Sequence, residues 1–255
     1  MSARIVLITG ANSGVGLATT KILTSTSTTY HVILSARTLP KAAAAKAEIE
    51  AENPTSASRL TPLELDVTSV ASVTRARDTI EAQFGRLDAL INNAAVANRG
   101  PDVYMRSRET MDVNVIGLAV VTDLFRPLLL KSANPYSIFV SSGAGSFGRT
   151  IERSKRTGEK PAEPPNGGAY HVSKAALNML ALREHVEFSE VGLKVFAMSP
   201  GFVVSGLRGK SEELRSGWGR AEPASEAGVF MLRILEGERD GDIGKLIWKG
   251  EVYEW

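Results

Sequence analysis

Short apolar runs alternate along the chain with longer stretches of mixed polarity. The first run, residues 5–8, reads Ile-Val-Leu-Ile without a polar interruption, as expected of a strand buried on both faces of a parallel sheet. Residues 69–84 instead have the spacing of an amphipathic helix, with Ser69 as its N-cap. The whole pattern predicts strands at 5–8, 31–35, 60–65, 87–91, 137–140, 193–198 and 246–248, and helices at 17–24, 41–52, 69–84, 113–131 and 169–188.

Alternation of strands and helices is typical of βαβ units, which build one open parallel sheet with helices on both faces. No stretch of the 255 residues is rich enough in Gly, Ser or Pro to separate two domains, so we predict a single doubly wound α/β domain over residues 1–255. Residues 149–168 interrupt the pattern, because they are polar, contain three prolines and have no hydrophobic period. We expect this segment to be a long surface loop.

Composition narrows the classes of function. The net charge of +2 gives no argument for a nucleic-acid or membrane partner. The absence of Cys excludes disulfides and a thiol nucleophile, and the three His residues lack metal-site spacing, so we expect no metal. No apolar run approaches the roughly 18 residues of a membrane span, and the first run is too short for a signal peptide. We expect a cytoplasmic protein, although an organelle address stays open.

A glycine-rich turn follows the first predicted strand and precedes the first predicted helix. Glycines allow a tight turn and let the backbone approach a diphosphate, and the following helix N-terminus offers free N–H groups to an anion. In this strand–turn–helix context the pattern indicates a dinucleotide site, with a tight turn that binds no ligand as the alternative. The predicted site consists of Gly10, Asn12, Ser13, Gly14, Val15 and Gly16.

The end of the second predicted strand bears on the choice of dinucleotide. An acidic residue there accepts from the ribose of NAD, whereas an Arg suits the 2′-phosphate of NADP. Residues 34–38 contain no carboxylate, and Arg37 lies 21 residues after Gly16. The sequence therefore favours NADP(H), with a solvated Arg37 as the alternative.

Tyr170 and Lys174 lie four residues apart in a predicted helix and so share one face. An ammonium group near a tyrosine hydroxyl favours the phenolate, and we expect Lys174 to lower the pKa of Tyr170. Tyr170 would then serve as an acid or base nearer neutral pH.

Further motifs follow other predicted strands. They are Asp66 after the third strand, Asn92-Asn93-Ala94-Ala95 after the fourth, Ser141-Ser142-Gly143-Ala144-Gly145 after the fifth and Ser199-Pro200-Gly201 after the sixth. In this order, and with the glycine turn and the Tyr170–Lys174 pair, residues 5–205 resemble the short-chain dehydrogenase/reductase family, and its carbonyl reductases in particular. The resemblance implies a Rossmann-type fold.

The resemblance also implies residue roles. The catalytic set would be Asn114, Ser142, Tyr170 and Lys174, with Ser142 preferred to Ser141 because it is in register with a Ser-x-x-Gly pattern. Cofactor contacts beyond the glycine turn and Arg37 would come from Asp66, Val67, Asn93, Ala94, Ala95, Tyr170, Lys174, Pro200, Gly201, Val203 and Ser205.

The chemistry implied by the resemblance is hydride transfer between a nicotinamide and the carbon of a carbonyl or secondary alcohol. Tyr170 would protonate the developing alkoxide, and Ser142 would hydrogen-bond the same oxygen. Lys174 would contact the nicotinamide ribose and tune Tyr170, and Asn114 would hold a water that relays protons.

The sequence departs from the family pattern in three places. Ala95 stands where Gly is usual, Ser205 stands where Thr is commoner, and 27 residues separate Ser142 from Tyr170, more than is usual. The 149–168 insertion would be a lid over the substrate or a cover on the face normally used for assembly. The insertion weakens the usual expectation of a tetramer, so a dimer or tetramer and a monomer all stay open. Residues 202–225 are the expected substrate-loop region, and residues 207–221 within it are expected to line the substrate pocket.

Three hypotheses about function follow. The leading one is an NADP(H)-dependent ketone or aldehyde reductase, and the second is an alcohol dehydrogenase that uses NAD(P) oxidatively. The third, from another class, is a dinucleotide-binding regulator without turnover. The full set of four expected catalytic residues argues against the third, because a sensor would not need it.

Overall fold

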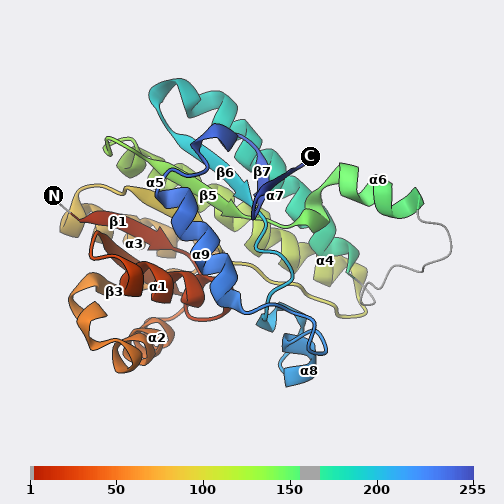
Figure 1. Ribbon diagram of the computed structural model, residues 1–255, viewed down its shortest axis with the longest axis horizontal. Helices are drawn as coiled ribbons and strands as arrows, with labels where there is room; N and C mark the ends of the chain where they lie inside the picture. The colour runs from red at the N-terminus through yellow and green to blue at the C-terminus, as the bar shows by residue number, and fades with distance from the viewer. Residues whose placement is uncertain (1–2, 156–166) are drawn as a thin grey trace.

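Eight strands of the described residues form one sheet in the order β3-β2-β1-β4-β5-β6-β7-β8 (Figure 1). The computed structural model describes residues 3–155 and 167–255. All neighbouring strands run parallel except β7 and β8, which are antiparallel. The strands are β1 Arg4–Ile8, β2 Tyr30–Ala36, β3 Leu60–Glu64, β4 Ala89–Asn92, β5 Tyr136–Val140, β6 Lys194–Met198, β7 Leu246–Trp248 and β8 Glu251–Tyr253.

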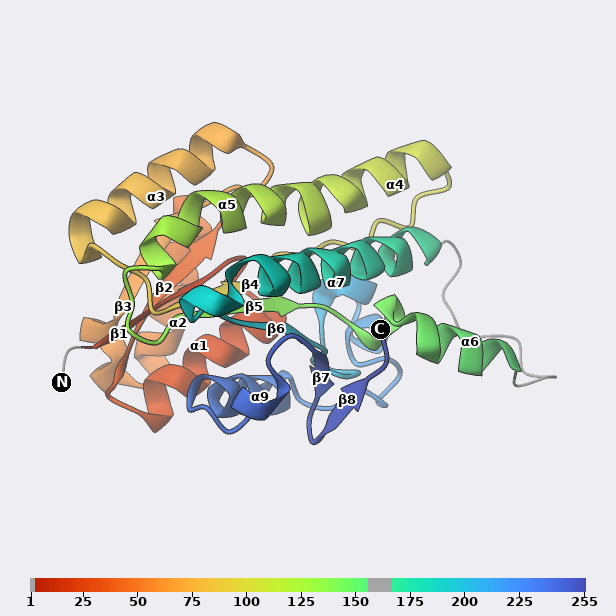
Figure 2. The ribbon, with the colours of Figure 1, turned by 90° about the horizontal axis from the view of Figure 1, so that it is seen from above.

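Helices cover both faces of this sheet. Figure 2 shows α3, α4, α5 and α7 on one side and α1, α2 and α9 on the other, while α6 projects away from the body. The helices are α1 Gly14–Thr26, α2 Leu39–Glu52, α3 Val70–Phe84, α4 Val103–Met111, α5 Leu118–Leu129, α6 Phe147–Lys155, α7 Gly168–Phe188, α8 Glu212–Arg215 and α9 Ala224–Leu235. The predicted Rossmann-type α/β fold, with helices on both faces of a largely parallel sheet, is confirmed.

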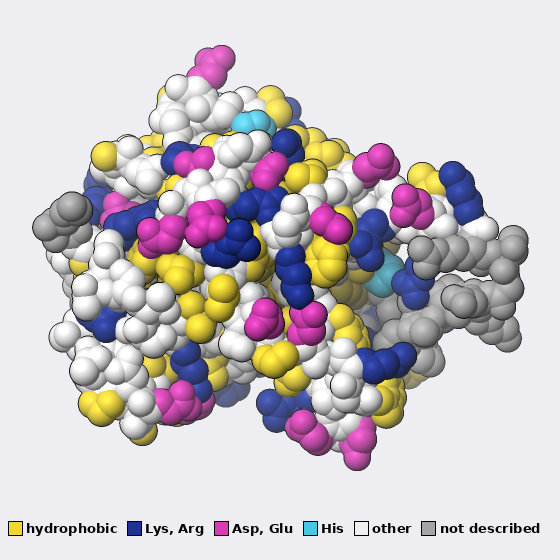
Figure 3. Space-filling view, in the orientation of Figure 1, with side chains coloured by type: hydrophobic (Ala, Val, Ile, Leu, Met, Phe, Trp, Pro, Cys, Tyr) yellow, Lys and Arg dark blue, Asp and Glu magenta, His cyan; other side chains and the backbone are white. Residues whose placement is uncertain are grey.

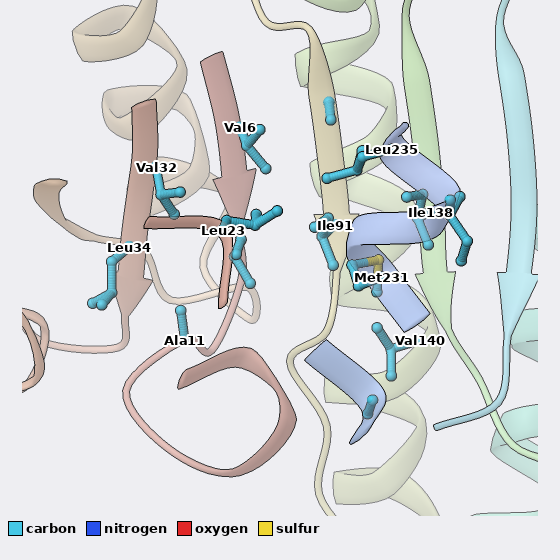
Figure 4. Close-up of a cluster of buried hydrophobic side chains, with 14 of the residues drawn as sticks. Val6, Ala11, Leu23, Val32, Leu34, Ile91, Ile138, Val140, Met231 and Leu235 are labelled. Atoms are coloured by element: carbon cyan, nitrogen blue, oxygen red, sulfur yellow. The ribbon is translucent and has the colours of Figure 1, made fainter. Parts of the chain in front are cut away.

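Two apolar cores lie on the two faces of the sheet. Val6, Ile91 and Ile138 point to one face and pack with Leu23 of α1 and Met231 of α9 (Figure 4). The alternate strand positions point to the other face and pack against α3, α5 and α7. Because the central strands are buried on both sides, their sequences contain consecutive apolar positions, which is why these strands could be recognised.

The predicted elements differ from the structure in several places. The expected helix at 113–131 is part of a longer helical segment, in which the π-helical turn Asp112–Gly117 separates α4 from α5. The expected loop at 149–168 is wrong at its start, because residues up to Lys155 belong to α6, and residues 156–166 lie outside the described residues. Helix α6 buries no residue, and its two large apolar side chains, Phe147 and Ile151, are exposed. Helices α8 and α9 and strand β8 were not predicted; α8 has four residues, and β8 is mostly exposed and only three residues long.

The order in which successive strands are added to the sheet reverses between β1 and β4. Strands β2 and β3 extend the sheet on one side of β1, and β4 and β5 extend it on the other. The carboxyl ends of parallel strands share one edge, and ligands of such sheets bind where the strand order reverses. This edge is therefore where the functional residues are expected to meet.

Candidate active site

The structure brings the predicted motifs to the carboxyl edge of the sheet. The glycine turn follows β1, and Arg37 and Asn93 come directly after β2 and β4. Asp66, Ser142 and Pro200 are each the second residue after their strands, β3, β5 and β6. The space-filling view shows the surface hollowed near this edge, between the part over α1 and α2 and the part that carries α8 (Figure 3). Residues far apart in sequence thus share one site because each ends a parallel strand.

Two of the three glycines allow close packing, and the third borders open space. A Cβ on Gly16 would stand 2.5 Å from Asn93 Nδ2 and 2.9 Å from Ala11 Cα. Gly10 has a φ of +63°, and a Cβ there would stand 3.0 Å from Ala94 Cα. Gly14 also has a positive φ, of +55°, but a Cβ there would meet no described atom within 4 Å. This open backbone next to the first turn of α1 fits a diphosphate.

The remaining residues of the turn also fit a phosphate site. Ser13 is the N-cap of α1, is exposed, and makes no capping hydrogen bond with its side chain. Asn12 and Val15 are partly exposed. Free N–H groups and an uncommitted hydroxyl at a helix N-terminus can hold phosphate oxygens.

Thr9 and Asn93 hold the glycine turn in place through hydrogen bonds. Thr9 Oγ1 accepts from the backbone N–H groups of Asn93 and Ala94, both at 2.9 Å. Asn93 Nδ2 donates to the carbonyl oxygens of Thr9 at 2.7 Å and Gly10 at 3.1 Å. The amide of Asn93 is thus committed to holding the turn, and Ala95 lies partly exposed beyond it. Thr9 was not among the predicted site residues, since a threonine at a strand end gives no signal by itself.

Arg37 is exposed directly after β2, and its guanidinium makes no hydrogen bond or ion pair within the described residues. A carboxylate that the sequence analysis overlooked lies on the neighbouring strand. Glu64 stands opposite Ala36 in the β2–β3 register and accepts from Leu39 N at 3.3 Å. The local environment of Arg37 therefore contains one acidic side chain that the linear sequence places far away.

Asp66 and Val67 form the next part of the edge. Asp66 Oδ1 accepts from the backbone N–H of Thr68 at 3.0 Å and from its hydroxyl at 2.7 Å. Val67 is buried, and a Cβ on Gly117 would stand 2.7 Å from its carbonyl oxygen. This close approach joins the β3–α3 loop to the π-helical turn that carries Asn114.

Ser142 and Tyr170 are joined by a hydrogen bond between their side chains, and Ser142 Oγ also accepts from Ala144 N at 3.1 Å. Ser141, one residue earlier, is buried and faces α7, where its hydroxyl bonds to the side chain of Asn178. Successive residues of an extended chain point to opposite sides. The structure therefore places Ser142, and not Ser141, beside Tyr170, in agreement with the register argument.

Tyr170 and Lys174 lie on one face of α7, with Lys174 Nζ 5.6 Å from the centroid of the Tyr170 ring. Burial raises the pKa of Tyr170 to about 12, although the hydrogen bond from Ser142 acts in the opposite direction. Lys174 is buried, and this burial lowers its pKa to about 7. Its Nζ donates to the carbonyl oxygen of Val140 at 2.7 Å. The expectation that Lys174 lowers the pKa of Tyr170 is wrong here, because desolvation outweighs the nearby charges.

Asn114 is fully buried in the π-helical turn. Its Oδ1 accepts from Val96 N at 2.8 Å, and its Nδ2 donates to Val96 O at 2.9 Å and to Ser173 Oγ at 3.0 Å. Ser173 lies between Tyr170 and Lys174 in α7 and donates to the carbonyl oxygen of Tyr170 at 2.8 Å. Asn114 thus ties the loop after β4 to the helix that carries the reactive pair.

The segment after β6 borders the site from the other side. Gly201 has a φ of +79°, and a Cβ there would stand 2.8 Å from Nε1 of Trp248. Pro200 is partly exposed, whereas Val203 is buried and its carbonyl oxygen accepts from Arg208 at 2.7 Å. Ser205 Oγ accepts from Leu207 N at 3.1 Å. The Ser205 hydroxyl is thus occupied in shaping the loop.

Two arginines near Tyr170 were missed by sequence analysis. Arg208, in the predicted substrate segment, and Arg99, in the loop between β4 and α4, each lower the pKa of Tyr170 by their charge. Neither belongs to a motif, so only the three-dimensional arrangement reveals them. Trp218, in the same predicted substrate segment as Arg208, is largely exposed.

Two searches of residues 3–155 and 167–255 bear on other classes of site. Within these ranges no three His, Cys, Asp or Glu side chains are grouped as a metal site would require. None of the helices there is both long enough and apolar enough to span a membrane.

Comparison with known proteins agrees with this geometry. A model of the family described as short chain dehydrogenase matches residues 4–215. The short-chain dehydrogenase/reductase tropE of Talaromyces stipitatus is 35% identical, with 98% of this chain and 97% of that protein covered. The short-chain dehydrogenase/reductase eupG of a Phoma species is 34% identical, with the same shares covered.

A solved structure is similar along the whole chain. The NADPH-bound carbonyl reductase from chicken fatty liver superposes with a TM-score of 0.81 at 26% identity, and all of both chains is covered. Its fold, the family match and the site at the sheet edge agree with one another. The chain therefore belongs to the short-chain dehydrogenase/reductase family of oxidoreductases, which bind a nicotinamide dinucleotide and act on small molecules.

Proposed function

We propose that this protein is an NADP(H)-dependent reductase of a ketone or aldehyde. The observation that carries the proposal is the hydrogen bond between Ser142 and Tyr170 beside buried Lys174, at the sheet edge that also carries the glycine turn. Two hydroxyls that converge in this way can hold one carbonyl oxygen. When bound, the nicotinamide supplies the hydride.

The state of Tyr170 favours reduction over oxidation. With a pKa of about 12, Tyr170 keeps its proton at neutral pH. Reduction of a carbonyl produces an alkoxide, which is a stronger base than a phenolate, so transfer of the Tyr170 proton to that oxygen is downhill. Oxidation of an alcohol would instead require the phenolate, which is scarce at neutral pH. This argument supports the reductase over the alcohol dehydrogenase.

Lys174 and Asn114 support the proton transfer. Lys174, with a pKa of about 7, can release and regain a proton near neutral pH and so restore the proton of Tyr170. Asn114 positions α7 through Ser173, and its bond to Val96 N fixes the loop on the other side of the site. We keep the proton-relay water at Asn114 as part of the proposal.

The cofactor preference is proposed to be NADP(H). Support comes from Arg37, an exposed guanidinium at the end of β2 that forms no ion pair within the described ranges. The similar carbonyl reductase from chicken is described as NADPH-bound, which agrees with this choice. The carboxylate of Glu64, on the adjacent strand β3, would repel a 2′-phosphate and so reduce the preference for NADP(H).

The decisive experiment is NADPH oxidation, followed by absorbance, against a panel of ketones and aldehydes. Tyr170→Phe removes the proton donor and should abolish turnover while NADPH affinity is kept. Tyr104→Phe is the matched control, because Tyr104 is exposed on α4. Full activity of Tyr170→Phe, or oxidation of alcohols by NADP⁺ faster than reduction at pH 7, would contradict the proposal.

A second copy of the chain is the proposed protein partner. Val172, Met179 and Val186 are exposed on α7 at seven-residue spacing and so form an apolar stripe along one side of the helix. Ile116 in the π-helical turn is exposed as well. We expect the wild type to be a dimer or tetramer by light scattering and Met179→Lys to lower its mass, whereas Leu39→Lys on α2 should not. A monomeric wild type would contradict this assembly.

A further inference from the structure

Arg208 is held rigidly in the segment after β6. Its Nε donates to Leu214 O at 3.0 Å, and its Nη2 donates to Val203 O at 2.7 Å and Arg215 O at 2.5 Å. Its guanidinium carbon lies 4.4 Å from the centroid of the Phe202 ring. These contacts fix the plane of the guanidinium without neutralising its charge, since carbonyl oxygens and a ring face carry no net charge.

One end of this guanidinium is uncommitted. Nη1 of Arg208 makes no hydrogen bond within the described residues, and no carboxylate there forms an ion pair with Arg208. Two acidic residues of the same segment, Glu222 and Glu213, form no ion pair with Arg208. Glu222 pairs with Lys249, and Glu213 lies exposed in α8.

A second guanidinium stands close by. Arg99, in the loop after β4, has a buried Nε. Its charge lowers the pKa of Arg208, and burial acts in the same direction. Both guanidiniums also act on Tyr170, so the three groups lie within electrostatic range of one another. Partial burial and the like charge of Arg99 both disfavour the charged form of Arg208, and an anion next to Arg208 would offset that cost.

We propose that Arg208 and Arg99 form an anion subsite beside Tyr170, and that the carbonyl substrate carries a carboxylate group. Nη1 of Arg208 would donate to a carboxylate oxygen, and Arg99 would add its charge to the same place. This inference rests on the proposed function, because it places the carboxylate next to the hydroxyl that receives the substrate oxygen.

The substrate, not the cofactor, is the expected source of the anion. The cofactor diphosphate is assigned to the glycine turn after β1, where the backbone at Gly14 is open. Arg208 lies instead after β6, in the electrostatic range of Tyr170, which is the reacting end of the site. Binding of a cofactor phosphate by Arg208 is therefore the alternative that the experiment must separate.

The experiment measures binding of a matched pair of probes, benzoate and benzamide, by calorimetry to the enzyme saturated with NADP⁺. We expect benzoate to bind at least about tenfold more tightly than benzamide, since a charge-assisted hydrogen bond is worth at least that factor. Arg208→Lys and Arg99→Gln should each reduce this ratio. Arg75→Gln, which removes one exposed charge from α3, is the matched control and should not change it.

The outcomes separate the inference from the proposed function. Equal binding of the two probes, binding of neither, or a ratio unaffected by both variants overturns the anion subsite. A weaker NADPH affinity in Arg208→Lys without a change in the probe ratio assigns Arg208 to the cofactor and also overturns it. In kinetics, an α-keto acid should be reduced more efficiently than its methyl ester. Reduction of neutral carbonyls alone keeps the proposed function and overturns the inference, whereas benzoate selectivity without any turnover does the reverse.

Discussion

The side-chain nitrogen Nδ2 of Asn93 lies 2.5 Å from the point at which a Cβ on Gly16 would stand. Asn93 reaches this position because its amide donates to the carbonyl oxygens of Thr9 and Gly10. The glycine turn after β1 and the loop after β4 are therefore one packed unit. The absence of a side chain at Gly16 serves this packing, whereas Gly14 borders the space in which a ligand fits.

Gly16→Ala and Gly14→Ala should separate these two roles. Gly16→Ala must displace Asn93 and Ala11, and overpacking of this kind costs about 1–3 kcal/mol of stability. Gly14→Ala meets no atom but strains a backbone of φ +55°, which costs about 1–2 kcal/mol. We expect Gly14→Ala to lose more NADPH affinity than its loss of thermal stability explains. Unfolding temperature and NADPH affinity of both variants check this, and equal affinity of Gly14→Ala and wild type would refute it.

Ser142→Ala and Ser141→Ala form a second matched pair. Ser142→Ala removes a hydroxyl that bonds Tyr170, and loss of such a donor lowers kcat by about 10²–10³-fold. Ser141→Ala leaves Oδ1 of Asn178 without its buried donor, although Nδ2 still donates to Gly145 O, and an unsatisfied buried acceptor costs about 1–3 kcal/mol of stability. The expected result is an inactive but stable Ser142 variant and a less stable but active Ser141 variant. Kinetics and thermal unfolding of the two variants provide the test. An active Ser142 variant together with an inactive Ser141 variant would contradict the assignment.

Lys174 makes the stability of the cofactor-free protein depend on pH. Burial lowers its pKa from the model-peptide value of 10.5 to about 7 in the folded state. Between pH 7 and 10.5 the unfolded chain therefore binds a proton that the folded chain does not, so this group makes stability rise with pH across that window. Below pH 7 both states are protonated, and the cost of the buried charge is fully present.

Lys174→Met should remove that contribution. Denaturant unfolding of wild type and variant at several pH values gives the difference in stability, which should be largest near pH 7 and shrink towards pH 10.5. Lys249→Met, at an exposed position, is the control and should leave the slope nearly unchanged. A difference independent of pH would show that Lys174 has an ordinary pKa.

Arg37→Ala should weaken NADPH binding by about 10–100-fold, the range expected for one charge-assisted hydrogen bond to a phosphate. NADH affinity should not change, because NADH has no 2′-phosphate. Glu64→Gln should strengthen NADPH binding, since it removes the carboxylate next to the same strand end. Calorimetric titration with both dinucleotides provides the test, and tighter binding of NADH than NADPH by the wild type would contradict the assignment.

Much of the fold followed from local patterns. Strands β1, β2, β5 and β6 each contain an apolar run of at least three residues because both of their faces are covered, and the turns between them carry glycine or capping residues. Since each motif was tied to a strand end, the parallel topology alone then predicted that the motifs would meet. Helix α6 and the short strand β8 bury no residue and so carry no buried apolar run, and their position depends on contacts with distant parts of the chain.

The C-terminal residues illustrate what a local pattern omits. Tyr253 stacks on Trp248 at a centroid distance of 5.7 Å and lies against Gly143, the residue after Ser142. The guanidinium carbon of Arg149, in α6, lies over the Tyr253 ring, 4.3 Å from its centroid. The backbone N–H of Gly148 donates to the carbonyl oxygen of Trp255 at 3.2 Å. The loop after β5, which carries Ser142, is thus supported by the last residues of the chain, and no sequence motif indicates this contact.

The sequence by itself determined the strand–helix alternation, the glycine turn, the pairing of Tyr170 with Lys174 on one helix face and the order of motifs. These follow from steric and periodic rules that act within a few residues. Tertiary structure decided which serine faces Tyr170, the commitment of Asn93 to the turn, the raised pKa of Tyr170 and the approach of Arg99 and Arg208. Those properties depend on burial and on charges from distant segments, and burial becomes defined only when the chain is packed.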